Sequence, residues 1–323
     1  MAKSLVDVLI ISFILTVVTG LYMVPVLKRR KVKQTVRNDG PKSHLKKNGT
    51  PTMGGLICIV SIIPMILYYL IFKKDMSNIG IFVSFLASSI LLGIIGFIDD
   101  FIKVELHSSD GLSPKLKMIL LLIISSILMI VLTYVIKIPT NIKLFFGNSI
   151  LLAPIIKILL DILVIISTTN AVNLTDGIDG LASSVGIMIM TFLAGYAIKV
   201  QNFAVALFLA MVIGAYIGFL LFNWHKAKIF MGDVGSFFLG AVIAIAAILL
   251  ELEIFLPIIA IIPVFEAISV MIQVGYYKKT KKRFFKMAPI HHHFENSGWS
   301  ELKVVTVFTM ITIFACIIVR FIL

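Results

Sequence analysis

Charged side chains are scarce in this sequence: Asp, Glu, Lys and Arg together make up 14% of its 323 residues. Soluble domains carry about 25% charged residues, so an ordinary soluble domain is excluded. Hydrophobic residues make up 59%, and the mean hydropathy is +1.07. The only two cysteines, Cys58 and Cys316, both lie inside apolar segments. We therefore expect them to pack as small hydrophobic side chains rather than to form a disulfide.

The first apolar run is not expected to be a cleavable signal peptide, and we interpret it as the first spanning helix. The first apolar run, 5–27, is too long for the apolar region of a signal peptide and contains no small-residue cleavage site. Runs of about the length that crosses a bilayer recur along the chain. The sequence therefore predicts an all-α polytopic membrane protein, with one integral membrane domain over 1–323 and ten transmembrane helices. The expected helices are 5–27, 54–72, 79–98, 116–136, 151–168, 181–198, 203–222, 235–250, 255–277 and 301–323.

The distribution of Lys and Arg predicts the orientation. An even number of helices places both termini on one side, and with both termini extracytoplasmic, 21 of the 29 basic residues fall on the cytoplasmic side. Every polar motif then lies on the cytoplasmic side, which predicts an active site in a cytoplasmic-side cleft. The extracytoplasmic segment 138–150, which contains Pro139 and Gly147, is expected to form a short hairpin.

Two other functional classes fit the sequence poorly. The net charge of +13 is compatible with nucleic-acid binding, but the charges cluster at helix ends, where topology and anionic headgroups or substrates explain them better. We therefore expect membrane lipids as partners and no nucleic acid. A transporter would carry charged residues near the membrane midplane, whereas here they gather at one surface. No internal repeat supports an inverted-repeat transporter.

The most polar stretch between two apolar runs is 170–182. Clustered carboxylates at the end of a membrane helix are costly and usually functional. Further acids lie at two other predicted helix ends, Asp99-Asp100 and Asp233. Carboxylates that converge from several helix ends in a basic chain indicate a Mg²⁺ site that handles phosphates. The candidates within the stretch are Asn170, Asn173, Asp176 and Asp179.

Each of these acids also has a simpler interpretation. Asp233 or Ser236 can be a helix N-cap, and the pair Asp99-Asp100 can be solvated at a helix end. However, an acid at a helix C-terminus opposes the macrodipole and needs another reason to be there. Neighbouring residues do not share a helix face, so we expect one acid of the pair to bind metal or phosphate-bound water and the other to orient Lys103.

Two more stretches are suited to phosphates. The loop Lys47–Gly55 precedes a helix whose first N–H groups can hold a phosphate or a nucleotide edge, although it can equally be a basic membrane-surface loop. The three histidines His291, His292 and His293 lack the spacing of a helical zinc site, and we expect them to contact phosphate. The basic stretch before them, 278–286, is typical of an interfacial helix. The isolated intramembrane acids Asp161 and Glu266 are expected to pack or to support other residues.

Five motifs resemble those of the phospho-N-acetylmuramoyl-pentapeptide-transferase family, within the superfamily of polyprenyl-phosphate N-acetylhexosamine-1-phosphate transferases. They occur in family order, and the ten-helix layout agrees from end to end. The motifs are Gly-Thr-Pro-Thr-Met-Gly-Gly (49–55), Asp99-Asp100, Asn-Ala-Val-Asn-Leu-Thr-Asp-Gly-Ile-Asp-Gly (170–180), Phe-Met-Gly-Asp-Val-Gly-Ser (230–236) and Ala-Pro-Ile-His-His-His-Phe-Glu (288–295).

This resemblance implies an Mg²⁺-dependent transfer of phospho-MurNAc-pentapeptide from UDP-MurNAc-pentapeptide to undecaprenyl phosphate, which yields lipid I and UMP. It further implies a role in peptidoglycan biosynthesis, cell shape and cell division, and a homodimer in the bacterial inner or plasma membrane. The lipid phosphate is already a nucleophile near neutral pH, because its second pKa is about 6. Catalysis then requires mostly alignment and charge neutralisation.

The resemblance also implies roles for single residues. Asp233 matches the Mg²⁺ ligand, and Lys47, Asp179, Asn223 and Phe230 match the uridine pocket. The full catalytic set is Asp99, Asp100, Lys103, Asp233, His291, His292 and His293, and the full substrate-binding set is Lys47, Thr52, Lys115, Asn170, Asn173, Asp176, Asp179, Asn223 and Phe230. A related GlcNAc-1-phosphate transferase stays open as an alternative, although 49–55 and 288–295 favour the muramoyl enzyme. One-step and two-step mechanisms both stay open.

Overall fold

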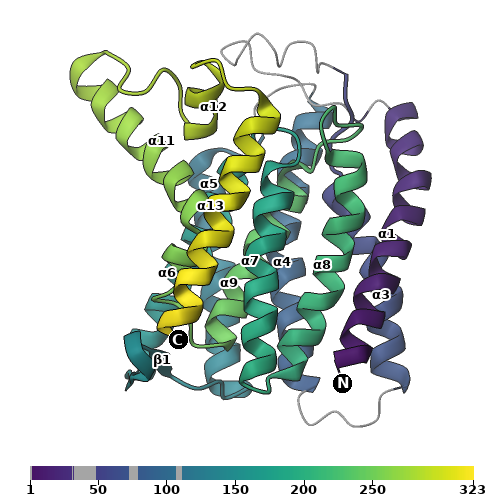
Figure 1. The fold of residues 1–323 in the computed structure, drawn as a ribbon, viewed down its shortest axis with the longest axis vertical. Coiled ribbons are helices and arrows are strands. Elements are labelled where there is room, and N and C mark those ends of the chain that lie inside the picture. The colour runs from purple at the N-terminus through teal and green to yellow at the C-terminus, as the bar shows by residue number, and fades with distance from the viewer. Residues whose placement is uncertain (1, 31, 33–48, 73–78, 107–110) are drawn as a thin grey trace.

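The computed structural model describes residues 2–30, 32, 49–72, 79–106 and 111–323. Most of the long helices run side by side along one axis and form an elongated bundle (Figure 1). The helices are α1 (Ala2–Arg29), α3 (Gly55–Phe72), α4 (Ile79–Glu105), α5 (Pro114–Ile130), α6 (Pro154–Thr175), α7 (Leu181–Lys199), α8 (Phe203–Asn223), α9 (Gly232–Leu249), α10 (Leu256–Ile259), α11 (Ile261–Thr280), α12 (Ile290–Glu295) and α13 (Glu301–Ile322).

The all-α polytopic fold is confirmed. Among the described residues, eight helices are long and apolar enough to cross a bilayer: α1, α4, α5 with its π-helical extension Val131–Val135, α6, α7, α8, α9 and α13. The shorter apolar stretch Gly55–Tyr69 of α3 falls below that length. The count of ten spans therefore stays a prediction, although each of the ten expected segments contains a helix.

The expected helix 255–277 is interrupted. It divides at Ala260 into α10 and α11. Pro263 has no N–H to donate to the carbonyl of Ile259, so the hydrogen-bond ladder cannot run through this point. Beyond the break, α11 leans away from the rest of the bundle (Figure 1).

The expected interfacial helix over 278–286 does not form as predicted. Only its first residues belong to α11, which ends at Thr280, and the residues that follow are bends and turns. The cause is Lys281, whose φ of 58° is left-handed and closes the helix. The basic and aromatic side chains of this stretch therefore lie on a loop between α11 and α12.

Helices α8 and α9 form the centre of the bundle. Both are apolar on all faces, and most of their residues are buried, as expected for helices enclosed by others. Helix α8 packs against α1 and α7, and α9 packs against α4 and α6. By contrast, α1, α5 and α13 expose large apolar side chains such as Leu21, Ile127 and Phe314, as lipid-facing helices do.

The predicted hairpin is confirmed. Strands β1 (Asn141–Lys143) and β2 (Ser149–Leu151) pair antiparallel, with Ile142 opposite Ile150. The hairpin and both chain termini lie at the lower end of the bundle in Figure 1, whereas α12 lies at the upper end. An even number of crossings agrees with this arrangement. Which side of the membrane each end faces stays a prediction.

Candidate active site

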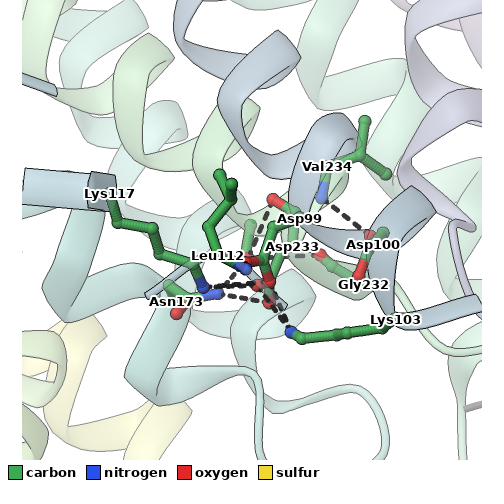
Figure 2. Close-up of polar contacts among 10 residues, drawn as sticks. Asp99, Asp100, Lys103, Leu112, Lys117, Asn173, Gly232, Asp233 and Val234 are labelled. Atoms are coloured by element: carbon green, nitrogen blue, oxygen red, sulfur yellow. Dashed lines mark hydrogen bonds and ion pairs between the residues drawn. The ribbon is translucent and has the colours of Figure 1, made fainter. Parts of the chain in front are cut away.

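Four charged side chains meet between α4, α5 and α9 and form what we call the acid–lysine cluster: Asp99, Lys103, Lys117 and Asp233 (Figure 2). The Lys103 Nζ lies 2.6 Å from Asp99 Oδ2 and 2.9 Å from Asp233 Oδ2. The Lys117 Nζ lies 2.9 Å from each of the same two oxygens. Each lysine is thus shared by both acids, and the cluster contains two positive and two negative groups.

Local sequence places these side chains. Lys103 follows Asp99 by one helical turn, so the two share a face of α4. Lys117 lies in the first turns of α5, whose start is fixed by Pro114 and by Ser113, which accepts a hydrogen bond from Leu116 N–H at 3.3 Å. The N–H of Leu112 donates to Asp99 Oδ1 at 2.7 Å. The connection that leads into α5 therefore anchors Asp99 as well.

The cluster is partly enclosed. The Asp99 side chain is fully buried, and the Asp233 and lysine side chains are 15% to 22% exposed. Ion pairs strengthen as the surrounding dielectric falls, and removal of one partner leaves an uncompensated charge. The exposed edge of the lysines and Asp233 is where a charged substrate can enter the network.

Asp100 has different neighbours from Asp99, as the helix geometry predicted. Its Oδ2 accepts a hydrogen bond from Val234 N–H at 3.0 Å. Helix α9 has no side-chain cap of its own at Met231. The Asp100 carboxylate on α4 caps it instead and interacts favourably with the positive end of the helix dipole. The N-cap interpretation of Asp233 is therefore wrong. Gly232, with φ of 75°, makes the approach possible, because a Cβ there would collide with Asp100 Oδ2.

The polar end of α6 completes the site. Asn173 Nδ2 donates to Asp233 Oδ1 and to Ser236 Oγ, both at 2.9 Å. Asp176 is the C-cap residue of α6. Burial, together with the negative charges of Asp233, Asp100 and Asp179, raises the pKa of Asp176 well above its ordinary value. Asp176 therefore retains a proton more readily than an exposed Asp does.

Two motifs far apart in the sequence pair through their backbones. The N–H of Phe230 donates to Pro51 O, and the N–H groups of Gly54 and Gly55 donate to Phe230 O and Met231 O, each at 2.9 Å. The N–H groups of Gly54 and Gly55 are thus satisfied within the protein, so they are not the phosphate donors that the loop composition suggested. Thr52, a substrate-binding candidate, is buried beside Gly232. Lys47 lies outside the described residues.

Three of the four uridine-pocket candidates come together. Asp179 Oδ2 accepts from Ala227 N–H at 2.9 Å. The amide of Asn223 accepts from Gly180 N–H at 3.2 Å and donates to Ile229 O at 3.1 Å. Phe230, half-buried, follows in the same segment. Asn223 therefore ties the start of α7 to the segment that carries Phe230.

The three adjacent histidines have different partners. His291 is buried, its Nδ1 lies 3.1 Å from Glu266 Oε2, and a Cβ at Gly177 would collide with its Nε2. The Nδ1 of His292 lies 2.7 Å from Glu295 Oε2. The Nδ1 of His293 accepts from Lys286 N–H at 3.1 Å and so holds the preceding loop. His291 is thus the histidine whose ring faces the acidic stretch 176–180.

Lys117 was missed by the sequence reasoning, which selected Lys115. The structure shows Lys115 exposed, whereas Lys117 contacts both acids. The sequence showed only that two lysines lie near the start of the same helix. It did not show which of them faces the acids. Asn170 donates its Nδ2 to Ile166 O at 2.8 Å within its own helix. Glu266, expected to pack or support, contacts His291.

Comparisons with known proteins show which family the chain is similar to. The model of Glycosyl transferase family 4 matches residues 82–251, and the phospho-N-acetylmuramoyl-pentapeptide-transferase signature 1 matches residues 47–59. The phospho-N-acetylmuramoyl-pentapeptide-transferase of Clostridium botulinum (strain Eklund 17B / Type B) is 47% identical over 98% of this chain and 95% of its own. The protein of the same name from Caldicellulosiruptor bescii is 43% identical over 96% of this chain and 94% of its own.

Proposed function

Because this chain belongs to the phospho-N-acetylmuramoyl-pentapeptide-transferase family, we propose that its acid–lysine cluster transfers phospho-MurNAc-pentapeptide from UDP-MurNAc-pentapeptide to undecaprenyl phosphate. An oxygen of the lipid phosphate attacks the phosphorus that bears the sugar, and the bond from that phosphorus to UMP breaks. The products are lipid I and UMP. The protein is thus a phospho-sugar transferase that crosses the bacterial membrane several times.

The observation that carries this proposal is the sharing of two lysines by two acids. Lys103 and Lys117 each contact Asp99 and Asp233 at 2.6–2.9 Å. An entering pyrophosphate gains two ammonium groups that are already oriented, and they neutralise charge that develops on the leaving UMP. Phosphoryl transfer needs such positioning and charge stabilisation more than it needs covalent chemistry.

Asp99 is our candidate for receiving the lipid phosphate. It lies in the last turns of α4, at the end of the bundle that carries the polar motifs, and its Oδ1 is held by Leu112 N–H. It either accepts the last proton of the phosphate or holds the phosphate for in-line attack. Because the second pKa of a phosphate is about 6, a strong base is not required. Asp100 supports the arrangement through α9.

The donor set fits a Mg²⁺ ion. The carboxylate oxygens of Asp99 and Asp233 converge on the same pair of cations, and Mg²⁺ prefers carboxylate and phosphate oxygens. Asp233, with Asp99 beside it, would hold the ion. When bound, the ion would neutralise and polarise phosphate oxygens. The expected test is loss of turnover after chelation and its recovery with added Mg²⁺.

The remaining parts of the proposal concern placement in the cell. The excess of basic residues supports a cytoplasmic position for the acid–lysine cluster, with both termini outside and ten spans. There a soluble nucleotide meets a lipid. We also propose a homodimer, which mass measurement of the detergent-solubilised protein would test.

One assay tests the function directly. Purified protein is incubated with UDP-MurNAc-pentapeptide, a polyprenyl phosphate and Mg²⁺, and UMP release is measured. UDP-GlcNAc replaces the substrate in a parallel reaction. Turnover with UDP-GlcNAc alone would contradict the muramoyl assignment and favour the related GlcNAc-1-phosphate transferase. Incubation with the UDP substrate alone, followed by a search for phospho-aspartate, distinguishes the two-step from the one-step mechanism.

A further inference from the structure

A second cluster of charged residues lies at the other ends of two helices that build the active site. Lys157 and Asp161 occupy the first turns of α6, whose last turn carries Asn173. Glu253 follows the end of α9, whose first turn carries Asp233. Asn173 follows Lys157 by 16 positions along the helix, which corresponds to about 24 Å. Lys157, Asp161 and Glu253, here called the buried triad, are therefore remote from the chemistry.

The triad is buried and tightly paired. The Lys157 Nζ lies 2.6 Å from Asp161 Oδ2 and 2.6 Å from Glu253 Oε1. The side chains are 1%, 0% and 0% exposed, respectively. Both acids contact one nitrogen, so their contacting oxygens lie no farther apart than twice 2.6 Å.

The charges of the triad do not balance. One ammonium faces two carboxylates, so full ionisation would leave one net negative charge in a buried site, and such a charge is strongly disfavoured. In addition, within the described part of the chain, Asp161 Oδ1 and Glu253 Oε2 have no hydrogen-bond partner. A single bound proton would remove the excess charge and would supply a donor for one of these oxygens.

The other charged groups on the elements packed around the triad have contacts outside it. The Lys143 Nζ on the hairpin donates to Leu250 O at 3.5 Å, and Lys143 N–H donates to Glu251 O at 3.1 Å. Lys199, at the end of α7, lies over the ring of Tyr196. On α11, which packs against α6, Glu266 faces His291.

We propose that the buried triad is a proton-binding site, in which Asp161 and Glu253 share one proton while Lys157 stays charged. Burial raises the pKa of Glu253 to about 7, with Lys157 lowering it and Asp161 raising it. A metal ion fits less well, because hard cations require about six oxygen ligands and the triad offers two oxygens without partners.

The sign of the pH effect follows from the direction of this shift. The pKa of Glu253 is higher in the folded protein than its reference value of 4.5. The contribution of the bound proton to stability is therefore complete below about pH 4.5 and is lost as the pH rises through about 7. One linked proton changes the unfolding equilibrium by at most about tenfold per pH unit.

The experiment compares the full-length protein in nanodiscs with Glu253→Gln, which leaves one ammonium facing one carboxylate. The matched control is Glu251→Gln, two residues away and outside the triad. Apparent Tm is measured from about pH 5 to about pH 8, the range that brackets the shifted pKa. We expect the Tm of the wild type and of Glu251→Gln to fall across this range, and that of Glu253→Gln to fall clearly less.

Infrared spectroscopy supplies a direct readout. The carbonyl stretch of a protonated carboxylic acid should be present near pH 6 and diminished in Glu253→Gln, but not in Glu251→Gln. Asp161→Asn replaces Glu253→Gln if the latter does not fold. An unchanged band and an unchanged Tm profile in a folded variant would overturn the proposal. A rise in Tm when sodium replaces choline at constant pH and ionic strength would overturn it in favour of a metal ion.

Discussion

The acid–lysine cluster and the buried triad use the same residue types in opposite ways. Each contains an Asp–Lys pair one helical turn apart, Asp99 with Lys103 and Lys157 with Asp161. The first cluster has two lysines for two acids and is partly exposed, whereas the triad has one lysine for two acids and is closed to solvent. A cluster with balanced charges and access to solvent admits charged ligands. A buried cluster with one acid in excess retains a proton. Exposure and charge count therefore indicate function better than residue type does.

The largest effect should come from Asp233→Asn. It removes the acid that both lysines and Asn173 contact, so we expect turnover to fall by at least about 100-fold while the protein stays folded. UMP release and Tm measure the two effects. Asp7→Asn, on an exposed position of α1, is the control. Near-normal turnover with normal Mg²⁺ dependence would remove Asp233 from the reaction.

Exchanging one lysine in each cluster sharpens the comparison. Lys157→Met leaves two acids buried without a cation, which should cost about 3–5 kcal/mol of stability. Lys117→Met should lower turnover by about tenfold or more with a smaller effect on Tm, because that cluster is accessible to water and ions. Lys279→Met, at an exposed position of α11, is the control for Lys117. Equal losses of stability in the two variants would break the distinction.

Asp99→Asn tests the role of the proton. We expect the largest loss of turnover at low pH, where the lipid phosphate is monoprotonated, and partial recovery above about pH 6, where the phosphate ionises by itself. The pH–rate profile measures this, with wild type as the reference. A loss that is equally complete at every pH, together with a trapped phospho-aspartate, would favour a covalent mechanism.

Phe230→Ala tests whether the substrate site extends from the acid–lysine cluster to the segment 223–230. Stacking on a base is worth about 1–3 kcal/mol, so the affinity for uridine-containing inhibitors should fall about tenfold or more. Calorimetric titration measures it, with Phe146→Ala on the exposed hairpin loop as the control. If the affinity is unchanged, Phe230 does not contact the nucleoside.

The smallest effect should come from Glu266→Gln. The Glu266 carboxylate and the His291 ring are both buried, as the triad is, but here one acid faces one ring. Glutamine keeps an oxygen acceptor for the ring and loses the charge. We therefore expect the transition state to lose about 1 kcal/mol of stabilisation, which lowers kcat about fivefold. Glu266→Ala should lose more. Identical kcat and identical pH profiles in both variants would reduce Glu266 to a packing role.

Patterns along the chain predicted much of this arrangement. Apolar runs located the helices, Pro139 and Gly147 marked the hairpin, and acids at helix ends located the site. Rotation of a helix and contact between distant segments are not visible in that pattern. For that reason Lys117 was missed beside Lys115.

The partners of the isolated acids were equally hidden. Lys157 precedes Asp161 by four residues, so that pair can be read from the sequence. Glu253 joins it only because α6 and α9 pack at one register, and Glu266 reaches His291 only because α11 packs against α12. Such contacts depend on tertiary packing, which a single sequence does not display.

The bond from Asp100 to the N–H of Val234 has a mechanical consequence. Thickness fluctuations of a bilayer make neighbouring helices slide along one another, and Asp99 and Asp233 lie on two helices that would slide. Asp100 joins the end of α4 to the start of α9 at 3.0 Å, so the two ends move as one part. The bond thereby opposes changes in the spacing between the two acids when the surrounding membrane deforms.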